Sequence, residues 1–310
     1  MPVINTNMSA TLTANALTKN ERAMSQSMER LSTGLRINSA ADDAAGLAIA
    51  SKMTSQINGL NQAVRNANDA ISMIQTADGA LVEVTNMLQR MRELSVQAAN
   101  GTNAAADQQN LNVEFTALKA GIDAIASNTQ WNGMAILAGD AVGAAVTRAF
   151  QVGANSEQMP VIFADFNTED AASPGKSDDG PLADLGGQLG TNGAADSNVD
   201  LASLSLYDTA TPAALTALEM ANVQRALDSA LGNINSERAK FGAAINRLEY
   251  TVDNLTNASQ NQSASRSRIQ DADYASETTE LARTQIIQQA GTAMLSQANQ
   301  QAQSVLALLK

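Results

Sequence analysis

The chain has 310 residues, 44% of them hydrophobic, so it is long enough to bury a sizeable core. Cysteine and histidine are both missing, which excludes disulfides, thiolate metal sites and a histidine general base. The net charge is −12, and residues 161–211 alone carry −8, from nine acidic residues and one lysine. An acidic middle disfavours nucleic acid and anionic membranes as partners.

The N-terminal segment, residues 1–43, predicts a helix with one apolar stripe. It contains no basic stretch followed by an apolar core, so no cleaved signal peptide is expected. A helix of this kind needs a partner that covers its stripe. The stripe consists of Leu17, Met24, Met28, Leu31 and Leu35.

Residues from about 44 to 100 predict one very long helix, because apolar side chains recur there every seven residues and no proline intervenes. At the standard rise such a helix is about 80 Å long. A shorter helix follows around Phe115. The repeated positions, which we expect to form a packed seam, are Leu60, Ala67, Ile74, Leu81 and Leu88.

The chain then changes character. Trp131-Asn132-Gly133 predicts a turn, and strands are expected around Phe150 and Ile162. Residues 166–211 are rich in glycine, serine and aspartate, so we expect a variable, loop-rich acidic segment with little core of its own. Gly175-Lys176-Ser177 looks like the end of a phosphate-binding loop, but the rest of that motif is missing.

Residues 212–258 predict a second long helix, with a seam at Leu227, Ile234, Phe241, Leu248 and Leu255. Arg238 falls on this seam. If the two long helices lie antiparallel with their ends at 44 and 258 aligned, Arg238 should face residues 64–69 and pair with Asp69. The alternative is that its side chain extends along its own aliphatic stem to reach solvent. Residues 259–310 predict a last helix, whose apolar stripe includes Ile287, Met294, Val305 and Leu309.

The fold class expected from these patterns is mainly α: a long antiparallel helical bundle or coiled-coil rod with a small β-hairpin region and a short variable middle segment. Both ends of the chain have an apolar stripe that needs burial. Such a chain is either a hairpin of its own termini or the subunit of a polymer.

Several long segments resemble bacterial flagellins, in the order in which that family has them. The N-terminal run of residues 31–47, LSTGLRINSAADDAAGL, is similar to the family's signature, and so is LQRMREL at 88–94. QVGAN at 151–155 and SRSRIQDADY at 265–274 match as well. The resemblance covers roughly residues 1–165 and 212–310, and the short middle is similar to that of compact flagellins.

The resemblance implies a structural subunit of the helical flagellar filament, without catalytic activity, cofactor or metal. Residues 1–43 and 259–310 would form an inner tube, and residues 44–165 with 212–258 an outer tube. Subunits would be exported to the cell exterior without a cleaved signal peptide. The implied partners are other copies of the chain, a filament cap protein, hook-filament junction proteins and an export chaperone for the C-terminal helix.

The resemblance also implies a surface that the flagellin-sensing Toll-like receptor of animal hosts recognises, at Gln89, Arg90, Leu94 and Glu114. From the residues alone, this is a charged helix face or a contact between subunits. Two other functions stay open. A hook-filament junction protein would share the terminal helices, and a soluble coiled-coil binding module would explain the seven-residue repeats but not the two apolar termini.

Overall fold

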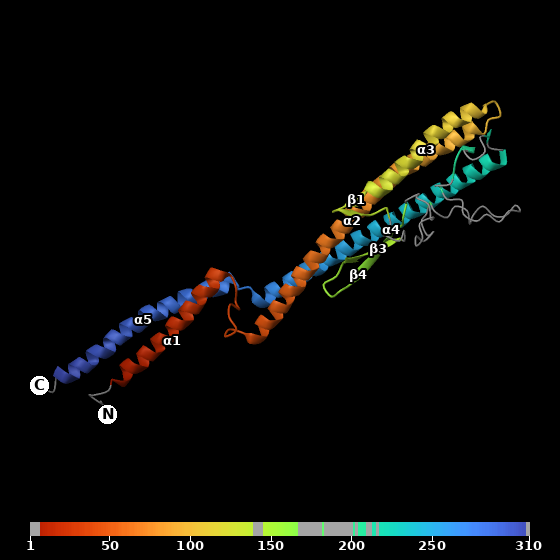
Figure 1. The fold of residues 1–310 in the computed structure, drawn as a ribbon. Helices are drawn as coiled ribbons and strands as arrows, with labels where there is room; N and C mark the ends of the chain where they lie inside the picture. The colour runs from red at the N-terminus through yellow and green to blue at the C-terminus, as the bar shows by residue number, and fades with distance from the viewer. Residues whose placement is uncertain are drawn as a thin grey trace. The chain divides into compact units, whose positions relative to one another are not determined.

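The computed structural model describes residues 7–138, 145–166, 182, 201, 204–208, 213–214 and 217–307. Helices α1 (Met8–Thr33), α2 (Ala44–Ala98), α3 (Ala105–Asn128), α4 (Ala217–Gln270) and α5 (Tyr274–Ala307) make up most of them (Figure 1). Short strands pair as β1 (Gln130–Trp131) with β2 (Met134–Ala135), β3 (Val146–Gln151) with β4 (Gln158–Phe163), and β5 (Tyr207–Asp208) with β6 (Ala213–Ala214). The chain is therefore mainly α, as the sequence predicts.

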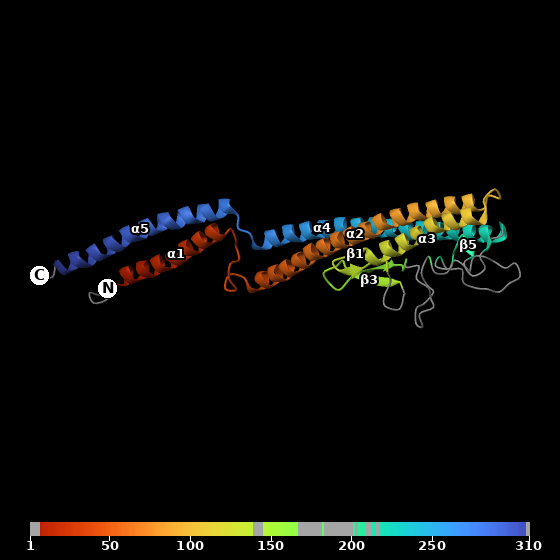
Figure 2. The same cartoon turned by 45° about the horizontal axis from the view of Figure 1, so that its top comes forward.

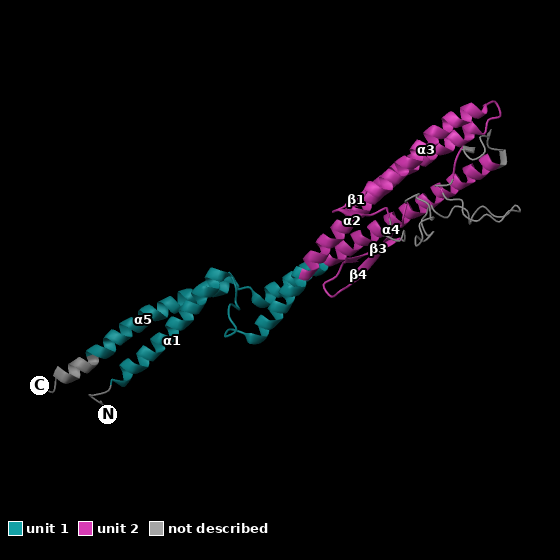
Figure 3. Cartoon of the chain, in the orientation of Figure 1, with its two compact units in different colours: residues 1–58, 257–310 teal, residues 59–256 magenta. Residues whose placement is uncertain are grey.

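The chain divides into two compact units (Figure 3). Unit 1 contains residues 1–58 and 257–310, and unit 2 contains residues 59–256. Both boundaries fall inside long helices, α2 and α4. The first boundary differs from the sequence-based division at residue 44, where α2 begins.

Helices α2, α3 and α4 form the core of unit 2, and they run side by side in two views (Figures 1 and 2). Leu60 of α2 and Leu255 of α4, the repeated positions nearest to the first and last residues of this unit, are buried. The seven-residue repeats thus give continuous buried stripes on both long helices. The core joins the repeated positions Ile74, Leu81, Leu88, Leu227, Ile234, Phe241 and Leu248.

Helix α4 begins at Ala217 and continues to Gln270, whereas the sequence suggested residues 212–258. This longer helix explains why the predicted pairing of Arg238 with Asp69 is wrong. Arg238 Nε donates to Asp78 Oδ1 at 2.7 Å instead. With α4 ending at 270, the position opposite Arg238 moves by about twelve residues, from about 64 to about 76, which is within one helical turn of Asp78.

Two antiparallel hairpins follow α3. In the β1–β2 hairpin, Asn132 and Gly133 both have positive φ, 49° and 75°, as a two-residue hairpin turn requires. In the β3–β4 hairpin, Met159, Val161 and Phe163 alternate inward. The Phe163 ring lies against Phe241 of α4, with ring centroids 5.4 Å apart, so this hairpin packs on the helical core.

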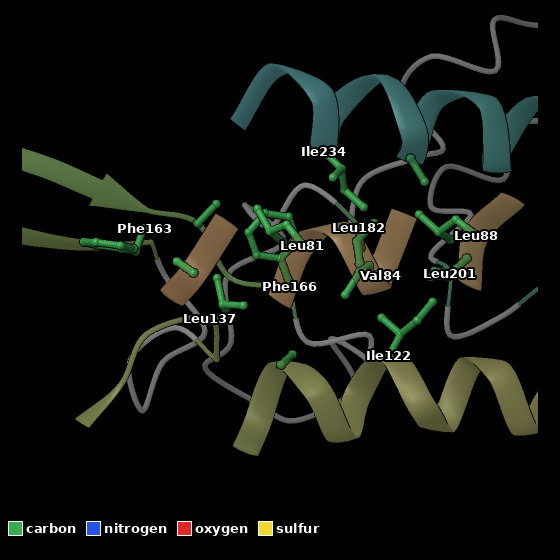
Figure 4. Close-up of a cluster of buried hydrophobic side chains, with 14 of the residues drawn as sticks. Leu81, Val84, Leu88, Ile122, Leu137, Phe163, Phe166, Leu182, Leu201 and Ile234 are labelled. Atoms are coloured by element: carbon green, nitrogen blue, oxygen red, sulfur yellow. The ribbon is translucent and has the colours of Figure 1, made fainter. Parts of the chain in front are cut away.

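The middle segment contributes to the core of unit 2, which the sequence analysis did not predict. Its buried apolar residues are Phe166, Leu182, Leu201, Leu204 and Leu206. Figure 4 shows Leu182 and Leu201 among core side chains such as Val84 and Leu88. Asn112 of α3 holds the segment by accepting hydrogen bonds from Leu206 N (2.9 Å) and Ser205 Oγ (3.1 Å). The phosphate-loop-like residues 175–177 lie outside the described residues.

Candidate functional site

Helices α1 and α5 of unit 1 form an antiparallel pair, called here the terminal pair, whose seam is polar. The two buried residues of α1 are Asn20 and Ser27. Asn20 Nδ2 donates to the carbonyl of the buried Thr284 at 2.7 Å. Arg30 Nη1 contacts Glu277 Oε1 at 3.1 Å, and the Nε of Arg30 is buried without a hydrogen-bond partner. Polar contacts thus align the two helices with little apolar burial.

The apolar side chains of the terminal pair are split between its seam and solvent. Leu17, Met24, Leu31 and Leu35 are half-buried. Val305 lies within α5, but its side chain and all of Leu309 lie outside the described residues. The pair therefore carries uncovered apolar surface, which water disfavours. The large apolar side chains left exposed are Met8, Leu12, Met28, Ile286, Ile287 and Met294.

The segments that lead into the terminal pair are joined by backbone hydrogen bonds. Arg36 N donates to the carbonyl of Gln270 at 2.7 Å, and Ala272 N to that of Gly34 at 2.9 Å. Gly34 ends α1 with a φ of 72°, a left-handed conformation that glycine adopts without strain. These bonds give residues 34–37 a fixed position against residues 270–272.

Asp42 organises the rest of this loop, residues 38–43. Its carboxylate accepts hydrogen bonds from Ser39 N (2.9 Å), Gln26 Nε2 (2.9 Å), Asn38 N (3.2 Å) and Ser39 Oγ (3.1 Å). These bonds favour the ionised form and lower the pKa of Asp42 to about 2, with the Ser39 backbone as the largest cause. The neighbouring Asp43 accepts from Gly46 N at 2.9 Å and so caps the start of α2.

A second candidate surface lies on α2 and α3 in unit 2. Arg90 donates to Glu114 Oε1 at 2.8 Å and to Glu93 Oε2 at 3.0 Å, and all three side chains are about half exposed or more. Glu114 and then Glu93 raise the pKa of Arg90. Gln89 is exposed beside them. Leu94, in contrast, is fully buried, so it supports this surface from below instead of forming part of it.

Within the described ranges, no group of three or more histidine, cysteine, aspartate or glutamate side chains is arranged to hold a metal ion. Nor does any helix in those ranges have the length and apolar character needed to cross a membrane.

At these two surfaces the structure has some of the features that the sequence predicts, and one that it does not predict. The structure brings Arg90 and Glu114 together from two helices, and it leaves Met28, Ile287 and Met294 exposed on the terminal pair. The polar seam of the terminal pair was not predicted, because the spacing of apolar residues does not mark buried polar residues. Its signal is Asn20 and Ser27, seven residues apart and in step with the half-buried positions of α1.

Comparison with known proteins gives a consistent result. Residues 4–141 match the family model of the bacterial flagellin N-terminal helical region, and residues 224–309 match that of the C-terminal helical region. The chain is 43% identical to a flagellin of Bacillus subtilis (strain 168), over 99% of each chain. It is 42% identical to the flagellar filament 33 kDa core protein of Treponema phagedenis, over 99% of this chain and 100% of that one.

Among solved structures, a putative flagellar hook-associated protein from Vibrio parahaemolyticus is similar, with a TM-score of 0.55. The alignment covers 74% of this chain and all of that one, at 14% identity. At this identity the likeness is one of fold alone.

Proposed function

The chain belongs to the bacterial flagellin family and is a structural subunit of the flagellar filament, and from that premise we propose which of its surfaces build the filament. The terminal pair, with the segments 1–43 and 259–310, forms the inner tube. Residues 44–165 and 212–258 form the outer tube. The supporting observation is the exposed apolar surface of the terminal pair.

The contrast between seam and outer surface supports this assignment. The seam between α1 and α5 buries Asn20, Ser27 and Thr284, while Ile287 and Met294 face outward. A helix pair that keeps its larger apolar side chains outside gains most of its burial from neighbours. In a filament those neighbours are the terminal pairs of other copies, which meet through repeated, non-closing contacts.

The same contrast supports export of an unfolded chain, and the family resemblance adds that no signal peptide is cleaved. Opening the terminal pair exposes little additional apolar surface, so the chain can unfold from its ends at low cost. The family resemblance adds a filament cap protein, hook-filament junction proteins and an export chaperone that binds the C-terminal helix. The resemblance supports these partners, and the exposed face of α5 offers the chaperone an apolar surface.

The inner-tube assignment is tested by changing the outward and inward faces of α5 separately. Ile287→Asn with Met294→Asn alters only side chains that are exposed in the subunit. We expect seeded polymerisation, followed by electron microscopy, to fail for this variant. Thr284→Val is the matched control, because it changes a buried seam residue of the same helix and should leave filaments intact. Normal filaments from the outward-face variant would contradict the assignment.

We further propose that Gln89, Arg90 and Glu114, supported by the buried Leu94, form the surface that the flagellin-sensing receptor recognises. The exposed ion pair between Arg90 and Glu114 supports this, because it presents both charges at one place. Arg90→Ala with Glu114→Ala should weaken receptor signalling by monomeric protein. Arg65→Ala removes an exposed arginine of the same helix, which bonds to Gln62, and should signal normally. Equal signalling by both variants would reject the assignment.

A further inference from the structure

The apolar seam of unit 2 does not by itself determine how α2 and α4 align. Buried residues recur every seven positions on both helices, at 60, 67, 74, 81 and 88 and at 227, 234, 241, 248 and 255. If α4 slid by seven residues along α2, about 10 Å, most apolar positions would again face apolar positions. Several registers therefore bury similar stripes, and a further feature must select one.

Charged residues can make this selection, because they do not repeat every seven residues. Arg238 of α4 contacts Asp78 of α2 at 2.7 Å, and Arg92 of α2 contacts Asp228 of α4 at 2.5 Å. Both pairs fit one antiparallel alignment to within about one helical turn. A slide of one heptad would place Arg238 opposite Ile71 or Thr85, and Asp228 opposite Thr85 or Ala99. Either slide breaks both ion pairs and brings neither Arg238 nor Asp228 opposite an oppositely charged residue.

The burial of Arg238 raises the cost of such a slide. Its side chain is 34% exposed and that of Asp78 is 36% exposed, so both are partly withdrawn from water. A partly buried guanidinium that loses its carboxylate keeps its desolvation cost without compensation. The pair therefore contributes less to stability than to discrimination against the wrong alignments.

We propose that Arg238–Asp78 and Arg92–Asp228 are the residues that select the register of α2 and α4 among heptad-related alternatives. The rival determinant is side-chain packing, above all the contact of Phe241 with Phe163 of the β3–β4 hairpin. The proposal is independent of the inner-tube assignment, because it concerns the alignment of two helices within one subunit. A subunit folded in a wrong register would present displaced outer surfaces to its neighbours.

The absence of cysteine from the chain allows a direct test by disulfide crosslinking of the full-length monomer. Thr85→Cys with Asn235→Cys reports the native register, since each position is one heptad away from the Arg92–Asp228 contact. Thr85→Cys with Gly242→Cys reports a slide in one direction, and Ile71→Cys with Gly242→Cys a slide in the other. These reporters leave all four charged residues in place.

In the parent chain only the native reporter should crosslink. With Asp78→Ala and Asp228→Ala, we expect the ratio of shifted to native crosslinks to rise about tenfold, as the loss of two ion pairs implies. Glu114→Ala is the matched control. It breaks the similarly exposed pair with Arg90, but α2 and α3 are joined by the short turn at residues 99–104, so no slide is available.

The charge-reversed pair, Asp78→Arg with Arg238→Asp, should restore the native crosslink when placed in the Asp228→Ala background. Unchanged crosslinks in the double alanine variant would overturn the proposal and assign the register to packing around Phe241. If the double alanine variant loses its helical circular dichroism signal, the proposal is tested with the charge-reversed pair instead. Recovery of helicity and of the native crosslink supports the proposal, and failure to recover them overturns it.

Discussion

Unit 2 and the terminal pair of unit 1 bury different kinds of side chain between their helices. In unit 2, α2 and α4 bury leucine, isoleucine and phenylalanine every seven residues, and strands and middle-segment leucines complete the core. In unit 1, the terminal pair buries Asn20, Ser27 and Thr284 and leaves Ile287 and Met294 outside. Apolar burial is the main driving force of folding. We therefore propose that unit 2 is folded in the single subunit, whereas the terminal pair is stabilised mainly by assembly.

The largest effect on assembly is expected from removing part of the terminal pair. Deleting residues 287–310 should abolish polymerisation and leave the thermal unfolding of unit 2 unchanged. Several apolar side chains lose burial between subunits, each contributing roughly 1.5–3 kcal/mol. Electron microscopy of seeded samples and circular dichroism check the two halves of this prediction. Filaments of normal length would show that the terminal pair is not the assembly surface.

Two single substitutions compare the units directly. Leu88 is fully buried in unit 2, so Leu88→Ala should lower the free energy of unfolding by about 2–5 kcal/mol. Met294 is exposed, so Met294→Ala should change monomer stability by less than about 0.5 kcal/mol and still slow assembly. Denaturant unfolding and light scattering measure the two effects. Equal losses of monomer stability would remove the distinction between the units.

The polar seam can also be made apolar, which sharpens the comparison. Asn20→Leu with Thr284→Val should stabilise the terminal pair of the monomer by on the order of 1 kcal/mol, because polar seam residues lower helix-pair stability. The expected readout is slower amide exchange in α1. Faster exchange would mean that the hydrogen bond from Asn20 to the Thr284 carbonyl contributes more than apolar contacts can replace.

The smallest effect concerns the loop at Asp42. Its folded pKa of about 2 lies below the ordinary 3.8, so its stabilising hydrogen bonds are fully present above about pH 4 and lost as pH falls through about 2. Asp42→Asn should therefore lower the melting temperature of the subunit slightly at pH 6 and by clearly less at pH 2. A difference of equal size at both pH values would show that the carboxylate charge is not the cause.

The sequence predicted the helices of unit 2 well because their seven-residue repeats are long and uninterrupted. It could not predict their register. The predicted partner of Arg238, Asp69, lies nine residues from the observed partner, Asp78, because a repeating apolar stripe leaves the alignment of the two helices open. The turn at Asn132-Gly133 was predictable, because few residue pairs adopt positive φ at two successive positions.

The buried residues of the middle segment could not be predicted from composition. Leu182 and Leu201 lie within an acidic, glycine-rich stretch, whose composition gives no reason to expect burial. Similarly, Leu94 belongs by sequence to an exposed charged face, yet it is fully buried. In both cases the tertiary neighbours decide burial, and the local sequence does not contain them.

The most direct test of the comparison is amide hydrogen exchange, followed by mass spectrometry, on the monomer and on the filament. We predict that residues 8–33 exchange rapidly in the monomer and become protected in the filament, while residues 60–90 are protected in both states. This result would show that assembly stabilises the terminal pair. Protection of residues 8–33 in the monomer equal to that of residues 60–90 would contradict it.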